Sequence, residues 1–275
     1  MKKPNTCTNL IKAINTIARG RDPVRLARAM ANVIIGQILP DGVIKGGSSL
    51  MFRYGESCTR YTRDIDTARV ADLDSYISKL SVALQTGWCG FTGIIVPVDP
   101  PSPEGVPDGY VMIPFDIKLS YCGRAWQTVR IEIGHNEIGD ADMAESALPS
   151  EMAEAFETLG FAKPKPLPVM RLSYQIAQKL HAVSSPGSAR AHDLIDLQLI
   201  MSHSTPDLPE VKSVCERLFT YRKQQAWPPS IQKGADWESI YQTSLATIRD
   251  NGFIAATVDE AIILVNDFIN KIAKA

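Results

Sequence analysis

Hydrophobic residues recur every three or four positions along much of this chain, which predicts amphipathic helices. One such stretch covers about residues 5–19, and a second begins at Asp22-Pro23, a capping residue followed by proline at the first helical position. We expect the second helix to end near Leu39. The same spacing predicts further helices at about 72–85, 150–159, 171–184, 190–202, 207–222, 234–249 and 257–273.

Apolar runs and alternating stretches predict strands in the first half of the chain. Gly42 to Ile44 is typical of the end of a buried strand, and residues 91–98 predict another. Tyr110 to Tyr121 and Ala125 to His135 both alternate and flank a Cys-Gly-Arg turn, so we expect a β-hairpin. In its second strand the residues predicted to share one face are Val129, Ile131 and Ile133, and those predicted to share the other are Arg130 and Glu132.

Proline and lysine dominate residues 162–168, a composition typical of a semi-rigid linker. We therefore expect one domain over residues 1–165 and a helical domain over residues 166–275. The predicted fold class is α+β, with a mixed β-sheet flanked by helices followed by an α-helical C-terminal domain.

Composition narrows the function only slightly. The 275 residues are 45% hydrophobic and 21% charged, and their net charge of −1 gives no global argument for nucleic-acid binding. A local cluster of basic residues consists of Arg19, Arg21, Arg25 and Arg28. Two interpretations of this cluster stay open: it forms a solvated surface, or it contacts RNA. No segment approaches the ~18 apolar residues of a membrane span, and the N-terminus lacks the apolar region of a signal peptide. We expect a cytoplasmic protein with no membrane partner.

The stretch from Lys45 to Asp66 carries the most informative pattern. Gly46 and Gly47 allow a tight turn after the first predicted strand, and Ser48 or Ser49 can cap the helix that follows. The N-terminus of a helix offers free N–H groups and a partial positive charge, which suits a phosphate.

Two aspartates follow about fifteen residues later, in Thr62-Arg63-Asp64-Ile65-Asp66. In a strand, Asp64 and Asp66 would point to the same face, with Ile65 buried behind them. Two parallel carboxylates are unfavourable unless a cation lies between them. A hard divalent cation is the usual solution, and Mg²⁺ is preferred where a nucleotide also contributes phosphate oxygens.

The order of strand, GG[ST] turn, helix and DxD strand resembles the nucleotidyltransferase superfamily with the DNA polymerase β-like fold. More narrowly, KGGSSLMFRYG and TRYTRDID resemble the AbiEii/AbiGii toxin group, which includes MenT-type toxins. Its members typically read KGG[TS]-x-L-x-x-x-Y-G and R-[FY]-S-x-D-L-D. Thr62 stands where that group commonly has serine, and the hydroxyl is retained.

A second half of the pattern lies in the predicted helical domain. Lys179 falls on an apolar stripe, where a charge is unfavourable unless it has a partner. Arg190, Asp193 and Asp196 then recur at intervals of three. The structural alternatives are a snorkelling surface lysine and a local ion pair worth only ~0.3–0.5 kcal/mol.

These residues also resemble the AbiEii group, in which K-[LF]-x-A precedes R-x-x-D-x-x-D-[LI]. The resemblance implies that Lys179 holds the triphosphate of an NTP and that Asp193 completes the active site. His192 departs from the group, which often has a basic residue there.

The resemblance implies a toxin that transfers NMP from an NTP to the 3′ end of tRNA and is paired with a cognate antitoxin. Asp64 and Asp66 would hold Mg²⁺ with Glu132, or with Asp116 in its place, and a plain solvent-facing role for Glu132 stays open. The residues expected to bind the nucleotide are Gly46, Gly47, Ser48, Thr62 and Arg190. Two alternatives are a transferase that modifies a protein or small-molecule hydroxyl and an inactive NTP-binding module.

Overall fold

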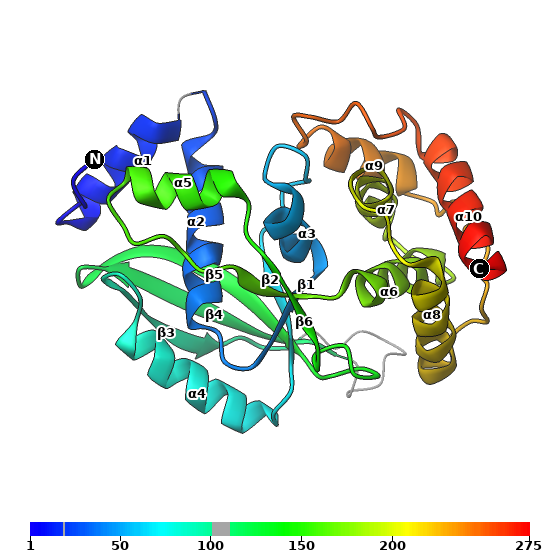
Figure 1. Cartoon of the computed structure of the whole chain (residues 1–275), viewed down its shortest axis with the longest axis horizontal. Coiled ribbons are helices and arrows are strands. Elements are labelled where there is room, and N and C mark those ends of the chain that lie inside the picture. Colours follow the sequence, from blue (N-terminus) through cyan, green and yellow to red (C-terminus); the bar gives the residue numbers. More distant parts are fainter. Residues whose placement is uncertain (19, 101–110) are drawn as a thin grey trace. The chain divides into compact units, whose positions relative to one another are not determined.

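A computed structural model describes residues 1–18, 20–100 and 111–275 of the chain, so Arg19 of the basic cluster and Tyr110 of the predicted hairpin lie outside the described residues (Figure 1). The chain has an α+β fold, as predicted. It divides into two compact units. Unit 1 consists of Met1–Gly55, Thr62–Asn136 and Ala141–Val169, and unit 2 of Glu56–Tyr61, Glu137–Asp140 and Met170–Ala275.

Unit 1 contains a seven-stranded mixed sheet in the order β3-β4-β5-β2-β1-β7-β6. Its strands are β1 Gly42–Lys45, β2 Ile65–Arg69, β3 Phe91–Pro97, β4 Ile113–Tyr121, β5 Arg124–Gly134, β6 Ala144–Ala147 and β7 Leu167–Met170. Its helices are α1 Cys7–Ala18, α2 Pro23–Ile38, α3 Gly46–Tyr54, α4 Leu73–Thr86 and α5 Ser150–Thr158.

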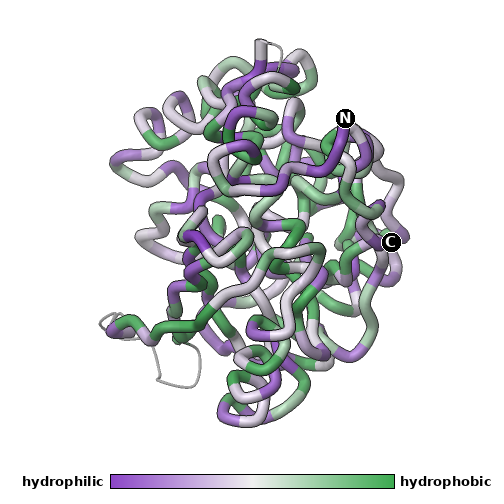
Figure 2. Tube along the Cα trace, turned by 90° about the vertical axis from the view of Figure 1, so that its left-hand side faces the viewer, coloured by the Kyte–Doolittle hydropathy of each residue, from purple (hydrophilic) through white to green (hydrophobic). Residues whose placement is uncertain are grey.

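The sheet buries one face against helices and carries polar residues on the other. Ile65 pairs with Ile131 across β2 and β5, and Ile117 pairs with Val129 across β4 and β5. These side chains belong to one core cluster with residues of α1, α2, α4 and α5. The alternation predicted for β5 is therefore confirmed. Figure 2 shows the Cα trace coloured by hydropathy, with hydrophobic and hydrophilic segments in both halves of the chain.

Two aspartates cap helices of unit 1, and the sequence predicts the cap at Asp22. The Asp22 carboxylate accepts a hydrogen bond from the Val24 N–H at 2.8 Å, and Asp72 accepts one from the Ser75 N–H at 2.9 Å. Each cap satisfies a backbone donor and contributes about 1 kcal/mol.

The linker predicted for residues 162–168 is wrong at its end, because β7 begins at Leu167. Val169 pairs with Ile44 of β1 in parallel, and Leu167 and Val169 are both buried in the core. Proline at every second position masks the alternating apolar pair that the strand buries. The short β6 was also missed, since its sequence is half polar.

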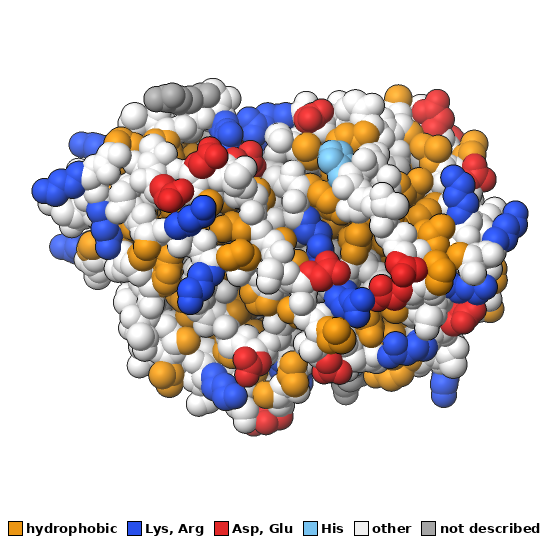
Figure 3. All heavy atoms as spheres, viewed as in Figure 1, with side chains coloured by type: hydrophobic (Ala, Val, Ile, Leu, Met, Phe, Trp, Pro, Cys, Tyr) orange, Lys and Arg blue, Asp and Glu red, His pale blue; other side chains and the backbone are white. Residues whose placement is uncertain are grey.

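Unit 2 is helical from residue 171 onward, which confirms that prediction. Its helices are α6 Leu172–Ser184, α7 His192–His203, α8 Leu208–Arg222, α9 Trp237–Leu245 and α10 Val258–Lys274, of which α9 is shorter than expected. Thr257 and Glu260 form a reciprocal capping box at the start of α10. Acidic and basic side chains are interspersed over the helices in Figure 3.

Two short segments from earlier in the chain belong to unit 2 through their hydrogen bonds. The Arg249 N–H donates to the Ser57 carbonyl at 3.1 Å, and the Tyr61 N–H donates to the Thr247 hydroxyl at 3.0 Å. Arg222 pairs with Glu137 of the second segment. Within the described parts of both units, no helix is long and apolar enough to cross a membrane.

Candidate active site

Three charged residues form a row across adjacent strands of unit 1. Lys45 of β1 pairs in register with Asp66 of β2, and Asp66 pairs with Glu132 of β5. Paired residues in a sheet point to the same face. Glu132 therefore lies in register with the second aspartate of the DxD motif, on the polar face of the sheet.

Asp64 lies one residue before β2, whereas the sequence predicts it inside the strand. The expected alternation still holds, because Ile65 is fully buried and both aspartates are half-buried. Burial raises the pKa of the Asp64 carboxyl above its usual range, although nearby Arg130, Arg28 and Arg63 oppose the shift. Burial likewise raises the pKa of Glu132, and the charges of Asp66 and Asp64 add to that rise.

Asp116, the alternative third acid, has another partner. It lies directly opposite Arg130 in the β4–β5 pairing, and its Oδ1 accepts a hydrogen bond from Arg130 Nε at 2.7 Å. The paired carboxylate is partly neutralised, whereas Glu132 lies in register with Asp66. This geometry favours Glu132 over Asp116 as the third acid.

The double glycine brings α3 against the second aspartate. Gly46 has a φ of +65°, and a Cβ atom built there would lie 1.9 Å from the Asp66 Oδ2 atom. Only glycine accommodates both the backbone conformation and this close approach. The predicted serine caps are wrong, because α3 begins at Gly46 with Lys45 at its N-cap and no side-chain cap.

Ser48 and Thr62 carry the two hydroxyls expected to contact phosphate. The fully buried Ser48 Oγ donates to the Asp64 carbonyl at 2.7 Å, so its proton fixes the residue next to β2. Thr62 Oγ1 is buried, and among the residues that the structure describes it has no hydrogen-bond partner. Of the two, Thr62 has the hydroxyl proton free to donate.

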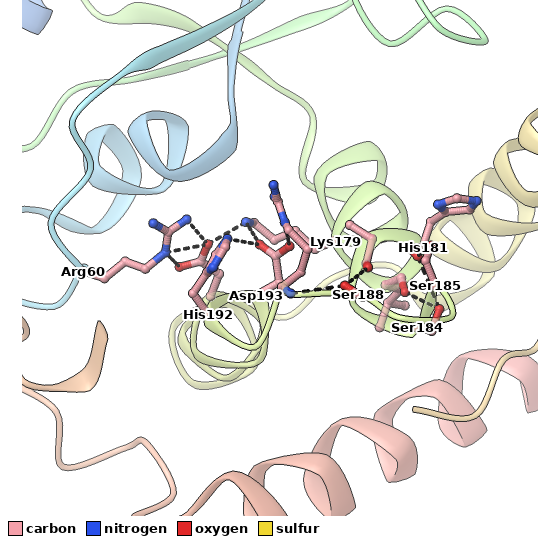
Figure 4. Close-up of polar contacts among 12 residues, drawn as sticks. Arg60, Lys179, His181, Ser184, Ser185, Ser188, His192 and Asp193 are labelled. Carbon is pink, nitrogen blue, oxygen red and sulfur yellow. Dashed lines mark hydrogen bonds and ion pairs between the residues drawn. The ribbon is translucent and has the colours of Figure 1, made fainter. Parts of the chain in front are cut away.

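Lys179 lies inside unit 2 and is held by two carboxylates (Figure 4). Its Nζ lies 2.8 Å from Asp193 Oδ1 and 2.6 Å from Asp196 Oδ2, and its side chain is 5% exposed. A snorkelling surface lysine is therefore excluded. An ammonium has three N–H donors, so these bonds leave one without a partner among the described residues.

Arg60 extends this network from the segment between α3 and β2. Its guanidinium donates to both oxygens of Asp196 at 3.0 to 3.2 Å, in a bidentate pair. Burial alone would raise the pKa of Asp196, but Arg60 and Lys179 together lower it. Asp196 is therefore ionised at neutral pH.

Arg190 and His192 flank Asp193 at the start of α7. The half-exposed Arg190 donates from Nε to Asp193 Oδ2 at 2.9 Å, which forms the expected i,i+3 pair. Burial would raise the pKa of Asp193, but Lys179 and Arg190 hold it well below its usual range. Burial lowers the pKa of His192 to about 4, so this position carries no positive charge at neutral pH.

The carboxylates of unit 1 have the oxygen donors that a hard divalent cation prefers. Throughout the part of the chain that the structure describes, no group of three His, Cys, Asp or Glu side chains forms a preassembled metal site. Mg²⁺ commonly binds through one or two carboxylates, water and substrate phosphates. The pair at Asp64 and Asp66 fits that mode better than a closed protein cage.

Comparison with known families decides the identity of the chain. Residues 28–262 match the family described as nucleotidyl transferase AbiEii toxin, type IV TA system. The chain belongs to the AbiEii family. The match includes both groups of candidate residues, those of unit 1 and those of unit 2. No curated protein matches this AbiEii-family chain significantly.

Solved structures similar to this AbiEii-family chain share little sequence with it. JHP933 from Helicobacter pylori is 16% identical, with 90% of each chain covered and a TM-score of 0.45. MenT4, a nucleotidyltransferase toxin from Mycobacterium tuberculosis H37Rv, is 17% identical, with 98% of each chain covered and a TM-score of 0.49.

The predicted site residues of this AbiEii-family protein fall into two groups. Unit 1 brings together Asp64, Asp66, Glu132 and the start of α3, and unit 2 brings together Lys179, Arg190 and Asp193. Sequence reasoning missed Lys45 and Arg60. Lys45 directly precedes the double glycine, which was an available signal, whereas Arg60 pairs with a residue 136 positions away and has no local signature.

Proposed function

We propose that this AbiEii-family toxin is a Mg²⁺-dependent nucleotidyltransferase that transfers NMP from an NTP to the 3′ end of tRNA. The reaction would block translation in the cytoplasm until a cognate antitoxin opposes it. The observation that carries the proposal is the register of Asp66 with Glu132 on the polar face of the sheet, beside Asp64 and the N-terminus of α3.

In unit 1, Asp64 and Asp66 would hold Mg²⁺, with Glu132 as the third acid. The backbone N–H groups at Gly46 and Gly47 begin a helix and favour phosphate oxygens. Ser48 fixes Asp64 through its carbonyl, and the unpartnered hydroxyl of Thr62 would donate to a phosphate.

In unit 2, Lys179 would bind the triphosphate through its third N–H, the one that does not donate to Asp193 or Asp196. Counting Arg60, Lys179 and Arg190 against Asp193 and Asp196, the network has a net charge of +1. This favours an anionic ligand. Asp193 is fully buried and forms ion pairs with Lys179 and Arg190. We therefore assign it the role of orienting Lys179 rather than that of acting on the acceptor hydroxyl.

The acceptor hydroxyl oxygen would form a bond to the α-phosphorus while the bond from that phosphorus to the bridging oxygen breaks. Pyrophosphate leaves with the electron pair, and the hydroxyl proton passes to solvent. Bound Mg²⁺ would supply charge stabilisation for these oxygens. The protein contributes alignment of the reactants and electrostatic stabilisation by Lys179 and the α3 N-terminus.

The test is incubation of the purified protein with total RNA and each α-labelled NTP, with and without Mg²⁺. We expect label on tRNA that needs Mg²⁺ and is lost in Asp64→Asn, while exposed Asp41→Asn stays active. Full labelling by Asp64→Asn would refute the site. Label confined to the protein or small-molecule fraction would refute the tRNA acceptor.

A further inference from the structure

Three arginines of unit 1 lie around Asp64, and the proposed reaction assigns them no role. They come from separate parts of the chain: Arg28 from α2, Arg63 from the position before Asp64, and Arg130 from β5. Burial raises the pKa of the Asp64 carboxyl, and the charges of Arg130, Arg28 and Arg63 lower it. All three side chains therefore lie within electrostatic reach of that carboxylate.

The pairing of β2 with β5 fixes the place of Arg130. Ile65 pairs in parallel with Ile131, so the residues directly before them, Asp64 and Arg130, are neighbours on the polar face. Arg130 donates from Nε to Asp116 Oδ1 at 2.7 Å, and among the described residues its two terminal NH2 groups have no hydrogen-bond partner. A guanidinium held in this way presents a planar pair of donors that suits a phosphate.

Arg28 and Arg63 reach the same place from outside the sheet. Arg28 Nη1 donates to the Thr128 carbonyl at 2.6 Å, two residues before Arg130 on β5. Arg63 is exposed and adjoins Asp64 in the chain. The one ion pair that any of the three arginines forms with a described carboxylate is that of Arg130 with Asp116.

The order of the strands puts these arginines and the glycine turn on opposite sides of β2. The order is β5-β2-β1, α3 starts directly after β1, and Arg28 and Arg130 belong to the β5 side (Figure 1). In phosphoryl transfer the attacking and leaving oxygens lie roughly in line. With pyrophosphate held at the start of α3, the attacking hydroxyl arrives from the β5 side.

Positive charge is needed on the side from which an RNA acceptor arrives. The phosphates near its 3′ end approach a triphosphate and the carboxylates of Asp64, Asp66 and Glu132, all of them negative. Arginines beside Asp64 offset that repulsion and bind the RNA backbone without regard to base sequence.

We propose that Arg28, Arg63 and Arg130 bind the backbone phosphates next to the 3′ end of the acceptor RNA. This inference rests on the proposed function, which supplies the acceptor. Arg130 contacts the phosphate nearest the attacking hydroxyl. Asp116 acts as a positioning residue, because its carboxylate holds the Arg130 guanidinium in place.

The test measures binding of tRNA labelled with fluorescein at its 5′ end, by anisotropy over a range of salt concentrations. The variants are Arg28→Gln, Arg63→Gln and Arg130→Gln, with Arg124→Gln at an exposed arginine of β5 as the matched control. We expect each of the three to weaken binding at least fivefold and to reduce the slope of log K against log salt by about 0.7, the share of one single-strand phosphate. The control should change the affinity less than twofold.

Kinetics separate this role from a structural one. In Arg63→Gln the KM for tRNA should rise at least fivefold, while the KM for the NTP that the wild type uses stays within twofold. Arg63→Lys keeps the charge and should bind tRNA within threefold of wild type. Since Arg63 is exposed, its variants decide the matter if Arg28→Gln or Arg130→Gln does not fold.

Three outcomes would overturn the inference and leave the proposed function standing. They are wild-type tRNA affinity and salt dependence in the folded arginine variants, an equal loss in Arg124→Gln, and a rise in the KM for NTP without one for tRNA. A wild type that transfers label to no RNA would overturn both.

Discussion

Asp66 and Glu132 face each other directly across the parallel pairing of β2 and β5. Two carboxylates in register on neighbouring strands repel each other, and half-burial removes part of the water that would screen them. Lys45 and Arg130 offset only part of this repulsion, because the pKa of Glu132 is still raised. Such an arrangement is typical of a site that a cation completes.

Glu132→Gln should stabilise the protein at neutral pH while it impairs nucleotidyl transfer. The pKa of Glu132 is higher in the folded than in the unfolded protein, so its ionisation costs stability as the pH rises through that range. Removing the charge should raise the free energy of unfolding at pH 7 by at most about 1 kcal/mol, since solvent screens a half-buried group. Urea unfolding at pH 7 measures this, and the gain should vanish at pH 3.

The matched control for that change is Glu154→Gln, at an exposed glutamate of α5. It should leave both stability and activity at wild-type values. A Glu132→Gln protein less stable than wild type at pH 7 would show that Glu132 has a partner that holds it ionised.

Gly46→Ala should disable the site by moving Asp66. Its added Cβ would meet the carboxylate, and alanine at a φ of +65° strains the backbone. We expect Mg²⁺-dependent transfer to fall at least 100-fold and Mn²⁺ binding, measured by electron paramagnetic resonance, to weaken. Gly252→Ala, with open space around its Cβ, should do neither. Normal metal binding by Gly46→Ala would contradict this account of the double glycine.

Asp196→Asn should strongly destabilise unit 2. Lys179 and Arg60 both depend on this carboxylate, and breaking a buried ion pair typically costs about 3–5 kcal/mol. Arg190→Ala removes a half-exposed partner and should cost less than about 1 kcal/mol. Urea unfolding of both variants at pH 7 gives the comparison, and equal losses would show that the network is not the structural centre of unit 2.

Two histidines of unit 2 should make the protein acid-sensitive. The pKa of His181 is lowered to about 4 by burial and by Arg222, and that of His192 is lowered to about 4 by burial. As the pH falls, these histidines bind protons in the unfolded chain before they do so in the folded protein. Their contribution to the free energy of unfolding is therefore fully present above the ordinary histidine pKa near 6.5 and is lost as the pH falls towards 4. Over this range each histidine should lower the free energy of unfolding by up to about 1.4 kcal/mol for each unit that the pH falls.

His192→Gln should remove its share of that slope. The free energy of unfolding between pH 6.5 and 4 measures it, with His203→Gln on α7 as the comparison. The prediction fails if the His192→Gln protein loses stability with acid as steeply as wild type.

Much of the fold could be predicted from local pattern, because the decisive signals were local. The alternation of Val129, Ile131 and Ile133 predicted the buried face of β5, and Asp22 marked the start of α2. β7 was masked because proline at alternate positions outweighed Leu167 and Val169 in the composition.

The candidate site residues could be predicted only where they lie close together in the sequence. Asp64, Asp66 and Gly46 stand in one motif, and Lys179 was notable because a charge interrupted an apolar stripe. Arg60 pairs with Asp196 far along the chain, and no periodicity signals such a contact. The sequence predicted that the Ser48 hydroxyl contacts phosphate, but in the structure this hydroxyl donates to the Asp64 carbonyl. That hydrogen bond depends on how α3 packs beside β2, which the sequence pattern does not show.

The central claim is that Asp64 and Asp66 bind the divalent cation and that Lys179 binds a triphosphate. The most direct measurement is a crystal structure with Mn²⁺ and a non-hydrolysable NTP analogue, with the metal located by anomalous scattering. We predict Mn²⁺ bound by Asp64 and Asp66, and a triphosphate in contact with Lys179. A metal bound away from both aspartates, or a triphosphate bound without Lys179, would contradict the account.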